Sequence, residues 1–228
     1  MKGVFVAGTD TGVGKTLVAA ALLRAFAASG RRAVGMKPVA SGAVVGPGGA
    51  AMWEDVVMLQ RAANVEAPLE WVNPYRFLPP VAPHLAAADA GAVIDLGCVA
   101  EAYGRLGDLA DVVVVEGVGG FLVPLNDREG AAEMVCRLGL PVVLVVGMRL
   151  GCINHALLTA EAVRSRGLRL AGWVANAIDP VMARFDDNLA ALRARLPAPL
   201  LGVIPPQDRP DPDPDAVATL LDLRAFFL

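Results

Sequence analysis

Short apolar segments alternate with longer helical ones along most of the chain. The short segments are rich in valine, leucine and alanine, and most are continuously apolar and do not alternate with polar positions. Continuously apolar strands are typical of a parallel sheet that is covered on both faces. The expected strands are Gly3–Ala7, Ala33–Lys37, Asp111–Glu116, Val142–Val146, Leu170–Ala175 and Leu200–Ile204.

Alanine- and leucine-rich segments between these strands have the length of helices. The expected helices are Lys15–Ser29, Asp55–Ala63, Leu96–Leu109, Glu129–Leu138, Asn154–Ser165 and Val181–Leu196. Three of them are followed by Gly30, Gly139 or Gly167, where left-handed caps belong. Gly42–Met52 and Gln207–Asp215 are expected to be irregular. The alternation predicts a three-layer α/β/α fold around a parallel sheet, in a single domain over residues 1–228.

Composition narrows the classes of protein to consider. The 228 residues are 55% hydrophobic and 19% charged, which excludes an intrinsically disordered chain. A net charge of −3 offers no basic surface for nucleic acid or an anionic membrane. The three cysteines are far apart and lack the spacing of a zinc site or a disulfide framework. No signal peptide or membrane span is visible, so we expect a soluble, unprocessed, cytoplasmic protein.

A glycine-rich turn joins the first strand to the first helix. It reads Gly-Thr-Asp-Thr-Gly-Val-Gly-Lys-Thr over residues 8–16, which is the context of a phosphate-binding P-loop. Backbone N–H groups of such a turn converge on phosphate oxygens, while Lys15 reaches the β- and γ-phosphates and the Thr16 hydroxyl binds Mg²⁺. Thr9 stands where the strict pattern has glycine, which indicates a variant loop. The alternative is an incidental turn with a solvent-facing lysine.

Two carboxylates are candidates for a second anchor of the metal. Glu116 ends a buried strand, where ligands of parallel sheets bind, and the glycine-rich segment 117–120 follows it. The alternative is a glutamate at the protein surface. Asp55 begins a helix, where an aspartate is most often a cap, so the residues alone do not make it a ligand.

Several motifs together resemble the dethiobiotin synthetase family. Gly8–Thr16 resembles that family's phosphate loop, and the resemblance extends in order from position 3 to about position 206. Its most specific motifs are Lys-Pro-Val-Ala-Ser-Gly at 37–42 and Gly-Cys-Ile-Asn-His at 151–155. The remaining motifs are Asn-Pro-Tyr at 73–75, Pro-His at 83–84, Glu-Gly-Val-Gly-Gly at 116–120, Gly-Trp-Val-Ala-Asn at 172–176, residues 197–202 and Ile-Pro at 204–205.

This resemblance implies a reaction. The family joins CO₂ to 7,8-diaminopelargonic acid with MgATP and closes a cyclic urea through a carbamate and its phosphoric anhydride. Positioning and neutralisation of charge are then the tasks of the protein, and no covalent enzyme intermediate is needed. The resemblance also implies a homodimer whose active sites lie at the interface.

The resemblance implies roles for particular residues. The catalytic set is Lys37, Lys15 and Thr11, and Thr16, Asp55 and Glu116 bind Mg²⁺. Ser41 binds the substrate amine or carbamate, while Gly151, Cys152, Ile153 and Asn154 bind the substrate carboxylate from the partner subunit. The nucleotide contacts are Gly12, Val13, Gly14, Lys15, Thr16, Leu17, Glu116, Gly117, Val118, Gly119, Asn176 and Pro205. Without the motif, Lys37 would read as a surface lysine at a strand end, and we expect it to contribute little to core burial.

Two positions depart from the family pattern. Ala177 stands where aspartate is common after the adenine-contacting asparagine, which weakens the expectation of strict adenine selectivity. Asn188 replaces a tyrosine often found there, which removes one expected contact to the substrate carboxylate. Three other classes remain as alternatives: a partition-type regulatory ATPase, a cobyrinate-type amidotransferase synthetase, for which the chain lacks room for a glutaminase domain, and a non-enzymatic binding module.

Overall fold

The computed structural model describes residues 3–207 and 212–226. A six-stranded sheet has the order β10-β9-β8-β1-β7-β2, and every neighbouring pair is parallel. Its strands are β1 (Gly3–Gly8), β2 (Ala33–Met36), β7 (Val112–Glu116), β8 (Val142–Gly147), β9 (Leu170–Asn176) and β10 (Leu200–Ile204). All the expected strands are present within one or two residues, and the predicted parallel sheet is confirmed.

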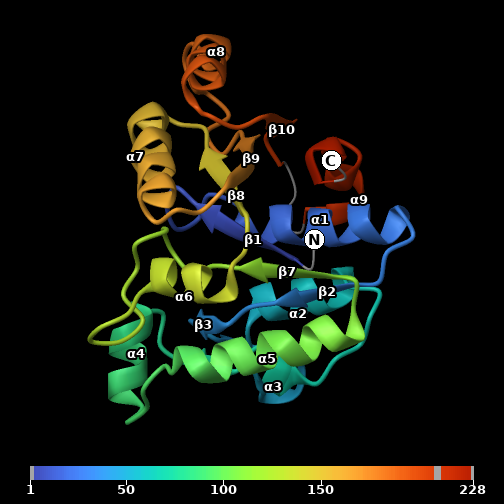
Figure 1. Cartoon of the computed structure of the whole chain (residues 1–228), viewed down its shortest axis with the longest axis vertical. Coiled ribbons are helices and arrows are strands. Elements are labelled where there is room, and N and C mark those ends of the chain that lie inside the picture. Colours follow the sequence, from blue (N-terminus) through green and yellow to red (C-terminus); the bar gives the residue numbers. More distant parts are fainter. Residues whose placement is uncertain (1–2, 208–211, 227–228) are drawn as a thin grey trace.

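Helices cover both faces of this sheet, with α1 and α9 on one face and α5, α6 and α7 on the other (Figure 1). The first face packs α1 against Val4, Val6 and Val114, whereas Phe5, Val113 and Val115 point into the second core. Successive residues of a strand face opposite sides, so a strand buried on both must be apolar throughout. The helices are α1 (Lys15–Ala28), α2 (Glu54–Ala62), α3 (Leu69–Val72), α4 (Pro83–Asp89), α5 (Leu96–Leu109), α6 (Ala131–Leu138), α7 (Cys152–Ser165), α8 (Phe185–Arg195) and α9 (Pro214–Ala218).

Local backbone chemistry sets the ends of several helices, as predicted at three C-terminal caps but not at two N-terminal starts. Gly30, Gly139 and Gly167 have φ of 83°, 64° and 70°, which confirms the left-handed caps. The expected helix 129–138 begins only at Ala131, because the Gly130 N–H donates to the Glu133 carboxylate at 2.8 Å. The expected helix 181–196 begins only at Phe185, after Arg184 with φ 57°.

Smaller elements between β2 and α5 were not predicted. β3 (Val39–Ser41) and β6 (Tyr75–Phe77) form a parallel pair outside the main sheet. The segment Gly42–Met52, expected to be irregular, contains the antiparallel pair β4 (Val44–Val45) and β5 (Ala51–Met52). Of the expected loop 207–215, residues 208–211 lie outside the described residues, and Pro214 already belongs to α9. None of the described helices is long and apolar enough to cross a membrane.

Candidate active site

A cavity of about 690 Å³ lies where β1, β2 and β7 end. Its walls come from the turn after β1, from the chain that follows β2 and β7, and from residues 80–83. The predicted site residues that line it are Thr11, Gly12, Gly14, Lys15, Thr16, Lys37, Ser41, Asp55, Glu116, Val118 and Gly119. The cavity therefore brings together groups from five separate parts of the chain, as expected at the carboxyl edge of a parallel sheet.

The turn after β1 has the backbone that its glycines permit. Gly12 and Gly14 have φ of 73° and 90°, in the left-handed region that side chains disfavour. A Cβ on Gly14 would also lie 2.2 Å from Asn176 Nδ2. Thr9 has no such φ, and its N–H donates to the Val145 carbonyl at 3.0 Å. Thr9 therefore extends the pairing of β1 with β8, and glycine is not required there.

Gly14→Ala is expected to abolish measurable ATP binding at millimolar nucleotide, because the new methyl group forces either the loop or Asn176 out of place. Its matched control is Gly30→Ala, which has a similar φ of 83° but nothing within 4 Å of the new Cβ. The control incurs only the strain of a left-handed alanine, which lowers its free energy of unfolding by about 1–2 kcal/mol, and it binds ATP normally. Titration calorimetry and denaturant melts measure both effects, and equal ATP affinities in the two variants would contradict this reading of the loop.

Lys15 is 7% exposed, so the alternative of a solvent-facing lysine is wrong. Its Nζ donates to the Asp10 carbonyl at 2.9 Å. Burial, and then the nearby Lys37 charge, lower the pKa of Lys15 to about 8. The Asp10 carboxylate in turn pairs with Arg149 at 2.6 Å, so the chain after β8 supports the turn that carries Lys15.

Lys37 and Glu116 form a buried ion pair at the floor of the cavity. Lys37 is 4% exposed and Glu116 is 1% exposed, which corrects the expectation that Lys37 contributes little to core burial. The Lys37 ammonium lies 2.6 Å from Glu116 Oε1 and 2.9 Å from Asp55 Oδ2, and it also donates to the Gly117 carbonyl at 3.1 Å. Burial disfavours the charged lysine, but the two carboxylates outweigh it and raise the pKa of Lys37.

Asn73 holds the backbone of Lys37 in place. Its side chain is completely buried, and Nδ2 donates to the Lys37 carbonyl at 2.6 Å and to the Tyr75 carbonyl at 3.0 Å. The Lys37 N–H donates to the Val72 carbonyl at 2.8 Å. The segment 72–75 therefore positions Lys37, a role that no property of the isolated Asn-Pro-Tyr motif indicated.

The oxygen atoms around Lys37 suit a magnesium ion. The Thr16 hydroxyl donates to Glu116 Oε1 at 2.8 Å, while Glu116 Oε2 is buried without a hydrogen-bond partner. Within the described residues no three His, Cys, Asp or Glu side chains are arranged as a metal cage. Magnesium is commonly held by one or two carboxylates plus substrate phosphates, so Thr16, Asp55 and Glu116 fit that mode of binding.

Other predicted nucleotide contacts lie around the turn. Asn176 ends β9 and is 5% exposed, and its Nδ2 donates to the Val13 carbonyl at 2.9 Å. The side chains of Val13 and Leu17 are buried in the core on the α1 face. Pro205 is exposed and directly follows β10. These side chains do not line the cavity, so any nucleotide contact by Val13 or Leu17 falls to their backbone.

The predicted carboxylate-binding turn at 151–154 does not line this cavity either. Gly151 has φ 94° and precedes α7, which begins at Cys152 and not at Asn154 as expected. The Cys152 N–H already donates to the Arg149 carbonyl at 3.0 Å, and its side chain is 1% exposed. Cys152 therefore packs in the core, whereas Asn154 is exposed.

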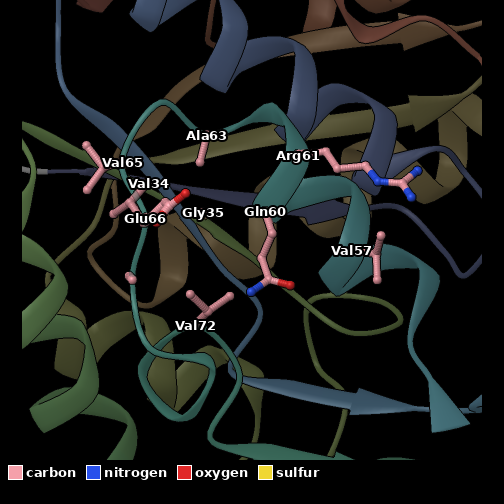
Figure 2. Close-up of a pocket in the computed structure, with 10 residues that line it drawn as sticks. Val34, Gly35, Val57, Gln60, Arg61, Ala63, Val65, Glu66 and Val72 are labelled. Atoms are coloured by element: carbon pink, nitrogen blue, oxygen red, sulfur yellow. The ribbon is translucent and has the colours of Figure 1, made fainter. Parts of the chain in front are cut away.

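A second cavity, of about 520 Å³, lies beside the edge strand β2. Figure 2 shows Val57, Gln60 and Arg61 of α2 together with Val34 and Gly35 of β2 around it. Its lining within the described part of the chain includes none of the residues predicted for the active site.

Comparisons with known proteins agree with this geometry. Residues 2–213 match the family model described as an AAA domain. The chain is 59% identical over 204 residues to the ATP-dependent dethiobiotin synthetase of Nitrosospira multiformis, covering 90% of this chain and 88% of that protein. The chain belongs to the dethiobiotin synthetase family. It is also 56% identical to the enzyme of the same name from Aromatoleum aromaticum, over 91% of this chain and 92% of that protein.

Solved structures support the fold of this dethiobiotin synthetase family member. The cell division ATPase MinD of Pyrococcus furiosus matches with a TM-score of 0.58 and 17% identity, over 96% of this chain and 95% of that one. MinD of Pyrococcus horikoshii, solved with Mg-ADP, matches with the same TM-score of 0.58, over 90% and 82%. At this low identity the likeness shows the fold alone. The predicted fold class, family and ATP-dependent ligase class are confirmed.

The cavity residues that the sequence did not indicate lie mostly in loops. Pro80, Val81, Ala82, Pro83 and Val123 complete the cavity wall. Pro83 belongs to the Pro-His motif at 83–84, which has no assigned role, and the other four residues carry no signal in the sequence. A cavity lined both by apolar residues and by two lysines is suited to an aliphatic substrate with polar ends.

Proposed function

We propose that the chain carries out the dethiobiotin synthetase reaction in the 690 Å³ cavity, with the residues of that cavity in defined roles. The first amine of 7,8-diaminopelargonic acid captures CO₂ as a carbamate. A carbamate oxygen then attacks the γ-phosphorus of ATP, and ADP leaves. The second amine attacks the activated carbonyl carbon, phosphate leaves, and the cyclic urea closes. The observation that carries the proposal is the convergence of Lys15, Lys37 and Ser41 on one cavity.

Each role follows from the chemistry of the side chain. Lys15 and Lys37 stabilise the negative charge on the migrating phosphoryl group and on the carbamate. Thr11, which lines the same cavity, helps to stabilise this charge. Ser41 hydrogen-bonds the amine or carbamate. Thr16, Asp55 and Glu116 would hold Mg²⁺, which when bound neutralises phosphate charge. ATP is bound by the backbone of Gly12, Gly14, Val118 and Gly119 in the cavity wall. Beside the cavity it is also bound by Asn176, Pro205 and the backbone of Val13, Leu17 and Gly117.

We further propose a cytoplasmic homodimer with shared active sites. The turn at 151–154 lies outside the cavity of its own chain, which leaves Gly151, Ile153 and Asn154 able to serve a partner. The start of a helix carries a partial positive charge that suits a carboxylate. The direct test of the whole proposal is to supply diaminopelargonate, bicarbonate and MgATP and to detect dethiobiotin by mass spectrometry.

Phosphate release is expected to depend on diaminopelargonate, because the γ-phosphoryl acceptor is the carbamate and not water. Phosphate is assayed with MgATP and bicarbonate, with and without the diamine. A mono-amine analogue that lacks the second nucleophile is the matched control, since it forms a carbamate but no ring. Robust hydrolysis that ignores the diamine would favour the partition-type ATPase.

Nucleotide choice is expected to be loose, with CTP or GTP supporting measurable turnover. The Asn176 side-chain nitrogen already donates a hydrogen bond to the Val13 carbonyl. Ala177 has no carboxylate that could accept a hydrogen bond from an amino group of the base. A single good contact discriminates between bases by about 1–3 kcal/mol. Kinetics with each nucleotide measure the preference, and Ala177→Asp should increase it. A preference for ATP above about a thousandfold in the unaltered chain would mean that other contacts select the base.

A further inference from the structure

The Lys37 ammonium lies between the two carboxylates that the proposed function gives to magnesium. It is 2.6 Å from Glu116 Oε1 and 2.9 Å from Asp55 Oδ2. We propose that Lys37 competes with the metal for these carboxylates, so that the metal binds strongly only together with a nucleotide. This inference rests on the proposed magnesium site, and it gives Lys37 a second role besides its contact with the substrate.

The competition follows from the number of acceptors that remain. Glu116 Oε1 already accepts from both Thr16 and Lys37, and only the buried Oε2 has no partner. The Gly117 carbonyl holds the same ammonium from a further side at 3.1 Å. A dication that bound Glu116 and Asp55 with Lys37 in this position would stand close to a buried positive charge, where the repulsion is weakly screened.

A nucleotide changes this balance. Lys15 places a second buried cation in the same cavity, so a metal ion that enters alone meets two positive charges. The phosphates of ATP add negative charge that both lysines and the metal can share. Lys37 would be released from Glu116 once the carboxylates held a metal, and it would then be able to turn toward Ser41, which lines the same cavity. Arrival of the metal would thereby make Lys37 available for catalysis.

Metal binding without turnover tests the inference. Mn²⁺ replaces Mg²⁺, and the concentration of free Mn²⁺ is measured by electron paramagnetic resonance in the absence of nucleotide, which gives the affinity of the protein for the ion. Lys37→Gln keeps a long polar side chain but removes the charge, and it is expected to bind Mn²⁺ about tenfold more tightly than the unaltered chain, or more. Lys37→Met serves as a second variant if the glutamine variant does not fold. Lys15→Met is the matched control, because it removes a charge from the same cavity without freeing Glu116 or Asp55, and it should increase the affinity less.

Two further measurements separate this inference from the magnesium site itself. Glu116→Gln added to Lys37→Gln must abolish the gain in affinity, which locates the ion. With ADP present, Glu116→Gln alone must weaken Mn²⁺ binding, and if it does not, the proposed metal site is wrong. If that site is present but Lys37→Gln binds free Mn²⁺ no more tightly than the unaltered chain, or no more tightly than Lys15→Met does, the competition is overturned.

Discussion

Lys37→Ala should lower kcat about a hundredfold or more, because it removes one of the groups that we propose stabilise the migrating phosphoryl charge. It should also lower the free energy of unfolding by about 3–5 kcal/mol, because Glu116 is then left buried without its cation. The Lys37 side chain is 5% exposed and that of Glu116 is 1% exposed, so this is a buried pair and not a surface one. Steady-state kinetics with MgATP measure the first effect, and denaturant melts in metal-free buffer measure the second.

A matched control distinguishes this pair from an ordinary ion pair at the surface. Arg32 and Asp111 lie 2.9 Å apart, but their side chains are 62% and 41% exposed. Arg32→Ala should change neither turnover nor stability appreciably, since exposed pairs contribute little. Lys37→Ala must be assayed at a temperature where its melt shows it folded. Turnover near that of the unaltered chain under those conditions would remove Lys37 from the mechanism.

The parts of the site that could be predicted are those with a local cause. Gly14, Lys15 and Thr16 are neighbours in the sequence, and strand, glycine turn and helix follow one another there. The same holds for the continuous apolar strands and for the glycine caps, whose conformation depends on the residue itself. A parallel sheet then brings the ends of β1, β2 and β7 to one edge whatever the detailed packing.

The environment of Lys37 could not be predicted, because its partners are distant in the sequence. Its contact with Glu116 spans 79 residues and exists only because β2 and β7 are neighbours in the sheet. The bond from Asn73 spans 36 residues and depends on the small β3–β6 pair, which has no clear periodicity. The sequence alone therefore places Lys37 at a strand end but does not indicate that its side chain is buried.

The Arg149–Asp10 pair spans 139 residues and was missed for the same reason. It connects the phosphate loop to the chain that leads into Gly151. If the turn at 151–154 serves the partner subunit, then each phosphate loop is tied to a segment that completes the other site.

Mixing two inactive variants is expected to restore activity if each active site draws on both subunits. One variant is Lys15→Ala, which damages the phosphate half, and the other is Gly151→Trp, which blocks the carboxylate half. A heterodimer then contains one site with both halves intact, so recovery should approach about half of the unaltered activity per heterodimer. A Cβ added to Gly151 would meet no atom within 4 Å, so the substitution there adds left-handed strain at φ 94° but no clash at the Cβ.

A second tryptophan variant and a second mixture serve as controls for this experiment. Gly167→Trp, beyond the other end of α7, imposes a similar left-handed strain with φ 70° and no nearby atoms, and it should stay active. Lys15→Ala mixed with Lys37→Ala should recover nothing, because both variants damage the same half of the site. Exchange of subunits is confirmed by mass spectrometry of differently tagged chains. If heterodimers of Lys15→Ala and Gly151→Trp form but remain inactive, the carboxylate is bound within one chain and the shared-site model is wrong.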